Sequence, residues 1–166
     1  APATGQQMPL AVEAGTLVLS DTDTRYQIGS FAEVLRDSRR TLTIADVTSG
    51  PHALDFHTDG RHRPNFGFTH DAFWFRFTLR NNSGIREWYL DTTREWVEEV
   101  DLFSQGADGN WQMEKVGTEI PYASRRVANE RPVFLVDVPP GQERAYYLRM
   151  RTSGSMALVG ELSAPL

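Results

Sequence analysis

Large hydrophobic residues recur at every second position within the stretch HDAFWFRFTLRNNSG, His70–Gly84. Because strand side chains alternate with period two, this stretch is predicted to be a strand. One face carries Phe73, Phe75, Phe77 and Leu79, and the other carries Trp74, Arg76, Thr78 and Arg80. The outer face of a half-buried strand usually carries small polar residues, whereas this one carries a tryptophan and two arginines. The second face is therefore either a binding surface or part of a second, polar-lined core.

Two other stretches have a complementary pattern. In RAYYLRMRT, Tyr147, Arg149 and Arg151 share one face, opposite a face of Tyr146, Leu148 and Met150. In EEVDLFS, Glu99, Asp101 and Phe103 lie opposite Val100 and Leu102. If these strands are neighbours in one sheet, Arg76, Arg149, Glu99 and Asp101 form a cross-strand charge ladder beside Trp74 and Tyr147. Such a ladder either solvates the outer face of a sheet or forms a platform for a polar or anionic ligand.

The rest of the chain is predicted to form short strands separated by turns. Strands are predicted within 15–21, 87–92, 98–105, 111–116, 132–138, 144–152 and 157–163, with turns at NNSG, ADGN and PPGQ. The stretch 41–47 is predicted to be a strand or an ordered extended segment, and 49–65 a long loop. Trp88 and Leu90 share a face and are expected in the core, and Gly67, Gly109 and Gly141 are explained by turns.

One short helix is predicted at Ser30–Ser38, because Ser30 precedes Glu33 with the spacing of a capping box. Many short strands with one modest helix are typical of an antiparallel β-sandwich or barrel. The expected organisation is a flexible N-terminal segment over 1–14 and a single β-sandwich domain over 15–166.

Composition narrows the class of protein. The net charge of −5 argues against nucleic acid as a partner, and there is no cysteine for a disulfide or a thiolate metal site. The lack of cysteine fits a cytosolic protein or a bacterial exported protein equally well. No apolar run is long enough to cross a bilayer, and the start APATGQQMPL is similar to a mature N-terminus left after cleavage of a leader.

Metal and catalytic chemistry have little support in the sequence. His52, His57 and His62 lie five residues apart, which matches no familiar zinc pattern. Asp55, Asp59 and Asp108 are candidate calcium ligands without the order of an EF-hand, so no cofactor is expected, with calcium as the open alternative. Glu98 and Glu99 point to opposite faces of one strand and do not form the carboxylate pair of a glycosidase, so this domain is not expected to be an enzyme.

A set of ordered segments resembles a known family. NFGFTHDAFWFRFTLRN, VDLF, ADGNW, GTEIPYASR and PPGQERAYYLRMRTSGS occur in the order and spacing of the second extracellular domain type of bacterial seven-transmembrane receptors with diverse intracellular signalling modules. The resemblance covers about Asp46 to Leu162. Its most specific parts are Asn65-Phe66-Gly67, Trp74-x-Arg76, and Tyr147-Leu148-Arg149 followed by Ser153-Gly154-Ser155.

The resemblance implies a periplasmic jelly-roll β-sandwich similar to carbohydrate-binding modules, in a protein of the inner membrane. It also implies a sensory input that acts through the receptor's own transmembrane helices on a cytoplasmic kinase, of the hybrid histidine kinase type, or on a diguanylate cyclase. The ligand is expected to be a carbohydrate or a small carboxylate. An alternative is a protein–protein module that forms a homodimer or contacts another receptor without a small ligand.

The residues predicted to contact ligand combine arginines, which suit carboxylates, with aromatic rings, which suit sugar faces. They are Trp74, Arg76, Trp96, Tyr122, Arg125, Tyr147 and Arg149. Trp96 has polar neighbours and is the best candidate for an exposed aromatic side chain. For each arginine, the alternative role is to close a structural loop through main-chain carbonyls.

Overall fold

Two packed sheets form the core of the protein, as a computed structural model describes it over residues 15–93, 97–117 and 133–165. The larger sheet contains β4 (His57–Thr58), β3 (Glu33–Asp37), β6 (Ala72–Asn81), β11 (Glu143–Arg151), β8 (Glu99–Gln105) and β9 (Trp111–Val116), in that spatial order, with β1 (Thr16–Leu19) beside β6. The smaller sheet contains β10 (Val133–Asp137), β7 (Glu87–Asp91), β13 (Glu161–Ser163) and β2 (Arg25–Gln27). The short strands β5 (Asn65–Phe68) and β12 (Ser155–Ala157) form a separate pair. The predicted all-β sandwich is therefore confirmed, and one pairing, β1 with β6, is parallel.

The main core lies between the two sheets. It takes the inward faces of the alternating strands, including Phe75 and Leu148 from the larger sheet and Trp88 and Phe134 from the smaller one, all at most 1% exposed. Trp88 and Leu90 are in the core as predicted. Glycines Gly109 (φ +80°) and Gly141 (φ +83°) occupy left-handed backbone positions in the turns β8–β9 and β10–β11, which explains glycine there.

The predicted helix at Ser30–Ser38 is wrong, because Glu33–Asp37 is strand β3 and pairs with β6. Val34 points into the main core, whereas Glu33 and Leu35 point to the opposite face, so a period of two outweighs the capping spacing. Residues Ile28–Ser30 form only a 3₁₀ turn, η2.

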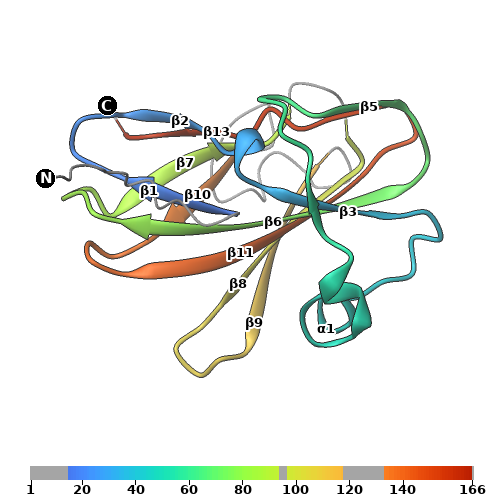
Figure 1. Ribbon diagram of the computed structural model, residues 1–166, viewed down its shortest axis with the longest axis horizontal. Helices are drawn as coiled ribbons and strands as arrows, with labels where there is room; N and C mark the ends of the chain where they lie inside the picture. Colours follow the sequence, from blue (N-terminus) through green and yellow to red (C-terminus); the bar gives the residue numbers. More distant parts are fainter. Residues whose placement is uncertain (1–14, 94–96, 118–132, 166) are drawn as a thin grey trace, which may run out of the picture.

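The one α-helix of the described residues is α1 (Ile44–Ser49), in a stretch that was predicted to be extended. Thr43 and Asp46 form its capping box: the Asp46 N–H donates to the Thr43 hydroxyl, and the Asp46 carboxylate accepts from the Thr43 N–H at 2.8 Å. A 3₁₀ helix, η3 (Pro51–Leu54), follows within the predicted long loop. Figure 1 shows α1 on the side of the larger sheet that faces away from β7, β13 and β2.

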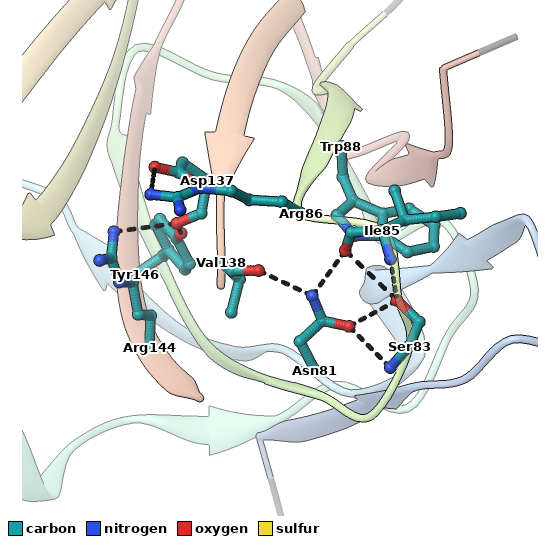
Figure 2. A network of polar contacts seen from close by, with 9 residues as sticks. All are labelled: Asn81, Ser83, Ile85, Arg86, Trp88, Asp137, Val138, Arg144 and Tyr146. Atoms are coloured by element: carbon teal, nitrogen blue, oxygen red, sulfur yellow. Dashed lines mark hydrogen bonds and ion pairs between the residues drawn. The ribbon is translucent and has the colours of Figure 1, made fainter. Parts of the chain in front are cut away.

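A buried polar network ties the two sheets together at the end of β6 (Figure 2). The Asn81 side chain donates from Nδ2 to the main-chain carbonyls of Ile85 and Val138, both at 2.7 Å. Its Oδ1 accepts from the Ser83 N–H at 3.0 Å and from the Ser83 hydroxyl at 2.6 Å. This amide therefore reaches its full hydrogen-bonding capacity with no water involved, and it links the larger sheet to both β7 and β10.

We expect Asn81→Ala to lower the free energy of unfolding by about 2–5 kcal/mol, since the Val138 carbonyl and the Ser83 N–H lose the buried partner that Asn81 supplies, while the Ile85 carbonyl keeps its bonds from Trp88 and Ser83. Urea denaturation monitored by tryptophan fluorescence measures this difference. The neighbouring Asn82→Ala is the matched control, because the Asn82 side chain is exposed, and its cost should stay within about 0.5 kcal/mol. Equal effects of the two substitutions would contradict the bridging role of Asn81.

Candidate functional site

The predicted adjacency of the three patterned strands is confirmed. Strand β11 lies between β6 and β8, and both pairings are antiparallel. Tyr147 lies opposite Arg76, and Arg149 lies opposite both Trp74 and Asp101. The outer face of the larger sheet therefore presents these side chains in neighbouring rows, as the period-two pattern indicated.

Trp74 belongs to a second hydrophobic core on this outer face. Its side chain is 1% exposed and packs with Leu35, Val47, Phe56 and Phe103. The Trp74 and Phe103 rings are stacked, with centroids 5.5 Å apart. Helix α1 and the segment after it supply the cover, so Trp74 presents no open surface to a ligand in this arrangement. The indole Nε1 is buried without a hydrogen-bond partner.

Arg76 holds this cover onto the sheet. It donates from Nε to Glu33 Oε1 at 2.9 Å and from Nη1 to the main-chain carbonyl of Ala53, in η3, at 2.8 Å. Its guanidinium carbon lies 4.3 Å from the centroid of the Phe56 ring, a cation–π contact. Arg76 therefore takes the alternative role considered for it, closing a loop through a main-chain carbonyl, while its side chain stays 26% exposed.

A hollow of about 200 Å³ lies beside Arg76, and we call it the Arg76 hollow. Its lining consists of Gly15, Glu33, Arg76, Phe77, Thr78, Ala145, Tyr146 and Tyr147. The small residues Gly15 and Ala145 leave the space open. Three polar groups of the lining make no hydrogen bond within the described residues: Arg76 Nη2, Glu33 Oε2 and the Tyr147 hydroxyl. The hollow thus offers a donor, an acceptor and a hydroxyl to a small polar ligand.

Tyr147 is held in place by two edge-to-face aromatic contacts. Its ring centroid lies 5.2 Å from that of Trp111 and 5.9 Å from that of Phe56. Such contacts restrict the ring, and no hydrogen bond to a described residue engages its hydroxyl.

The predicted charge ladder is present next to the second core for Arg149, Glu99 and Asp101, whereas Arg76 pairs with Glu33 instead. Arg149 Nη1 lies 3.6 Å from Glu99 Oε1 and 3.7 Å from Asp101 Oδ2. Lys115 Nζ bonds to Asp101 Oδ1 at 2.9 Å, and Arg151 pairs with Glu99. Burial opposes the ionisation of Glu99, but the hydrogen bond from Arg151 and the charge of Arg149 outweigh it and lower the pKa of this carboxyl. In this cluster, three cations of the described residues share two carboxylates.

Arg149 is the cation of this cluster with the weakest engagement. Its side chain is only 14% exposed, and its two ion pairs are longer than hydrogen bonds. Among the residues that the structure describes, no acceptor forms a hydrogen bond with its guanidinium. Its five N–H donors therefore remain available for a carboxylate or for water.

The motif pieces that carry the family resemblance have structural roles. Phe66 stacks on Phe73 with ring centroids 4.4 Å apart, so it packs the sandwich. The Ser153 hydroxyl donates to Glu98 at 2.6 Å and its N–H donates at 3.1 Å, and these bonds with Ser153 hold the pKa of Glu98 at about 2. Glu98 thus anchors the chain after β11 to the start of β8.

The remaining candidates are engaged in local contacts or fall elsewhere. His52 lies 3.3 Å from Asp55, Asp59 pairs with Arg61, and Asp108 accepts hydrogen bonds from Asn110. In the described ranges, no three His, Asp or Glu side chains converge on a point where a metal ion could bind. Trp96, Tyr122 and Arg125 lie outside the described residues, as does the predicted flexible segment 1–14.

Glu33 is the site residue that the sequence analysis missed. It was assigned to a helix cap, although it is the carboxylate that faces Arg76 in the hollow. The signal was available in the alternation of Glu33, Val34 and Leu35, which fits a strand as well as a helix start.

We expect Arg76→Gln to loosen the cover without unfolding the sandwich. The loss of the Glu33 and Ala53 bonds should cost about 1–3 kcal/mol and should speed amide exchange at Ala53 and Asp55, whose N–H groups are bonded within η3. Arg80→Gln is the control, because Arg80 lies on the same strand and its ion pair with Glu143 is exposed. Unchanged exchange in η3 would contradict the pinning role of Arg76.

Comparison with known proteins agrees with the motifs. No curated protein matches the chain. The family described as 7TMR-DISM extracellular 2 matches residues 29–163, which is most of the chain and includes the second core and all of the lining of the Arg76 hollow except Gly15. Within the described residues, no helix is long and apolar enough to span a membrane. The chain belongs to the 7TMR-DISM extracellular 2 family, and is thus a periplasmic sensory domain of a seven-transmembrane receptor.

Proposed function

We propose that this domain senses a small polar ligand, a carbohydrate or a small carboxylate, in the Arg76 hollow and passes the event to the cytoplasmic output of the receptor. The output is proposed to be a histidine kinase of the hybrid type, with a diguanylate cyclase as the other candidate. The observation that supports the site is that Arg76 both lines the hollow and holds η3 against the sheet. A ligand that binds this guanidinium therefore acts on the cover as well.

The size and polarity of the hollow limit the ligand. A cavity of about 200 Å³ is below the usual range of about 300–1,000 Å³ for drug-sized ligands, so one sugar ring or a short carboxylate fits and a long oligosaccharide does not. The pairing of Glu33 with Arg76 leaves the hollow without net charge. A ligand with both hydroxyl donors and a carboxylate matches the available Oε2, Nη2 and phenolic groups.

Signalling requires that the ligand prefer one arrangement of the domain. Only a difference in affinity between two states shifts their populations. A carboxylate that pairs with Arg76 competes with Glu33 and with the Ala53 carbonyl, so binding favours a state in which η3 and α1 are held differently. The transmembrane helices of the receptor are the proposed partners that read this change.

We propose that this domain recognises a ligand and does not catalyse a reaction, because the family it belongs to is an extracellular domain of receptors. The carboxylates of the outer face agree with that role, since Glu99 and Asp101 are paired with cations and Glu98 is bonded to Ser153. Any enzymatic activity is therefore proposed for the cytoplasmic part of the receptor.

A protein-contact role is the alternative, and it has one supporting observation. Leu54 and Phe68 are each 87% exposed, which is unusual for large apolar side chains. If these residues mediate self-association, the mass in solution measured by light scattering rises with protein concentration and falls in Phe68→Ser.

The direct test of the ligand proposal is a thermal-shift series with a neutral hexose, a hexuronate and succinate, each with and without calcium. A ligand that binds only the folded state raises the free energy of unfolding, by about 2.7 kcal/mol when its concentration is a hundred times its dissociation constant. The melting temperature rises as a result. We expect a shift with the hexuronate or succinate that is lost in Arg76→Lys, which keeps the charge but not the planar fork.

The same shift should persist in Arg80→Lys, the exposed arginine of the same strand. A shift that survives Arg76→Lys would place the ligand elsewhere, and the absence of any shift with all three compounds would count against the proposal. The calcium arm shows separately whether a cation is needed.

A further inference from the structure

Among the described residues, no further strand pairs with β10 at the edge of the smaller sheet, and the hydrogen-bond pattern shows which groups this edge presents. The Val138 N–H donates to the Arg86 carbonyl at 3.0 Å, so these two residues form a hydrogen-bonded pair. In an antiparallel ladder such pairs alternate with pairs that do not bond each other. Val136 therefore bonds to β7, whereas Leu135, opposite Tyr89, directs its N–H and C=O away from β7.

The Asp137 end of this edge is closed by side chains from β11. Arg144 donates from Nη1 to the Asp137 carbonyl at 2.9 Å, and the Tyr146 hydroxyl lies 3.4 Å from the same oxygen (Figure 2). Burial raises the pKa of Tyr146 to about 12, so its hydroxyl stays a donor. The bonded Asp137 carbonyl confirms that this side of β10 faces β11. Within the described residues, Leu135 has no comparable partner.

The sequence of β10 has no feature that would prevent another strand from pairing with its edge. Natural edge strands usually carry lysine, proline or a bulge that prevents pairing with another strand. β10 reads Val-Phe-Leu-Val-Asp, with its one charged residue at the closed end. Such an edge is suited to pairing.

A cleft of about 600 Å³ lies against this edge, and we call it the β10 cleft. Its lining consists of Leu102, Ser104, Gln112, Met113, Glu114, Lys115, Leu135, Val136, Asp137, Arg144 and Tyr146. Ser104 and Leu102 alternate along β8 on the face that carries Tyr146, so the wall opposite β10 alternates between polar and apolar positions. Arg144 bonds to the Asp137 carbonyl and lies within hydrogen-bonding range of the Tyr146 hydroxyl, and among the described residues its other N–H donors, of five in all, have no further partner.

We propose that the β10 cleft binds an extended peptide, which adds to the smaller sheet as a strand beside β10. Main-chain bonds to Leu135 supply affinity in this mode, and alternate side chains supply specificity. An apolar residue of the peptide faces Leu102 and Tyr146, and an acidic residue pairs with Arg144. A single strand is the proposed occupant, because the β10 edge faces a cleft whose other wall is formed by β8 and β9.

This site shares only Tyr146 with the lining of the Arg76 hollow, and the tests of the two sites use other residues, so the two proposals can fail independently. Arg76 and Arg80 lie on β6 and contribute nothing to the lining of the β10 cleft. Peptide binding should therefore be unchanged in Arg76→Lys.

The test uses the synthetic peptide acetyl-Val-Thr-Val-Glu-Val-amide and the same peptide with alternate amides N-methylated. Binding is followed by amide exchange and by heteronuclear NMR of the domain. We expect the first peptide to bind saturably, to slow exchange at the Leu135 amide by about tenfold or more, and to lose about tenfold in affinity in Arg144→Gln. The N-methylated peptide cannot form the ladder and should not bind.

Matched proline variants test the edge itself. Leu135→Pro removes an N–H that β7 does not use and should fold but not bind, whereas Val136→Pro removes an N–H of the ladder and should be strongly destabilised. If Leu135→Pro does not fold, Ser104→Trp fills the cleft from β8 without changing β10 and should abolish binding.

Three results would overturn the proposal. One is a Leu135 amide as protected in the free domain as that of Val136. The others are equal binding of the two peptides and peptide binding that survives Ser104→Trp.

Discussion

The fully buried amide of Asn81 is the interaction on which the arrangement of the two sheets depends. It joins the last residue of β6 to carbonyls beside β7 and after β10, and all four of its hydrogen bonds are satisfied by protein groups. A buried polar group of this kind specifies one arrangement, because any shift of one sheet against the other leaves unpaired carbonyls. Both proposed sites follow from that arrangement: β6 carries the hollow on its outer face, and β10 borders the cleft.

The outer face of the larger sheet combines packing with recognition. Trp74, the tryptophan on the otherwise polar face of the first predicted strand, is part of the second core and therefore stabilises the fold. Arg76 lies two residues further along the strand. Its Nε and Nη1 hold the fold through hydrogen bonds, whereas its Nη2 has no bond to a described residue and can donate to a ligand. A sensory domain needs such a connection, because a ligand that touches only rigid residues favours no alternative state.

Alternation along the chain predicted much of this structure. It identified β6, β8 and β11, the residues that share their faces, and the charge ladder among Arg149, Glu99 and Asp101. It could not show that α1 and η3 cover Trp74, because a period of two says which side chains share a face but not what packs on it. Local rules failed at Glu33, where a capping spacing coincided with a strand whose partner, Arg76, is 43 residues away. The open edge at Leu135 depends on hydrogen-bond phase, which no sequence pattern records.

The most direct test of the central claim, that Arg76 is the ligand contact which also controls the cover, is an NMR titration of the domain with a hexuronate. Arginine Nε–H signals and the amides of η3 are followed together as the ligand is added. The account predicts that the Arg76 Nε–H and the Ala53 and Asp55 amides shift with one common dissociation constant, while the Arg80 Nε–H does not move. Saturable binding that leaves the Arg76 signal and the η3 amides unchanged would contradict it.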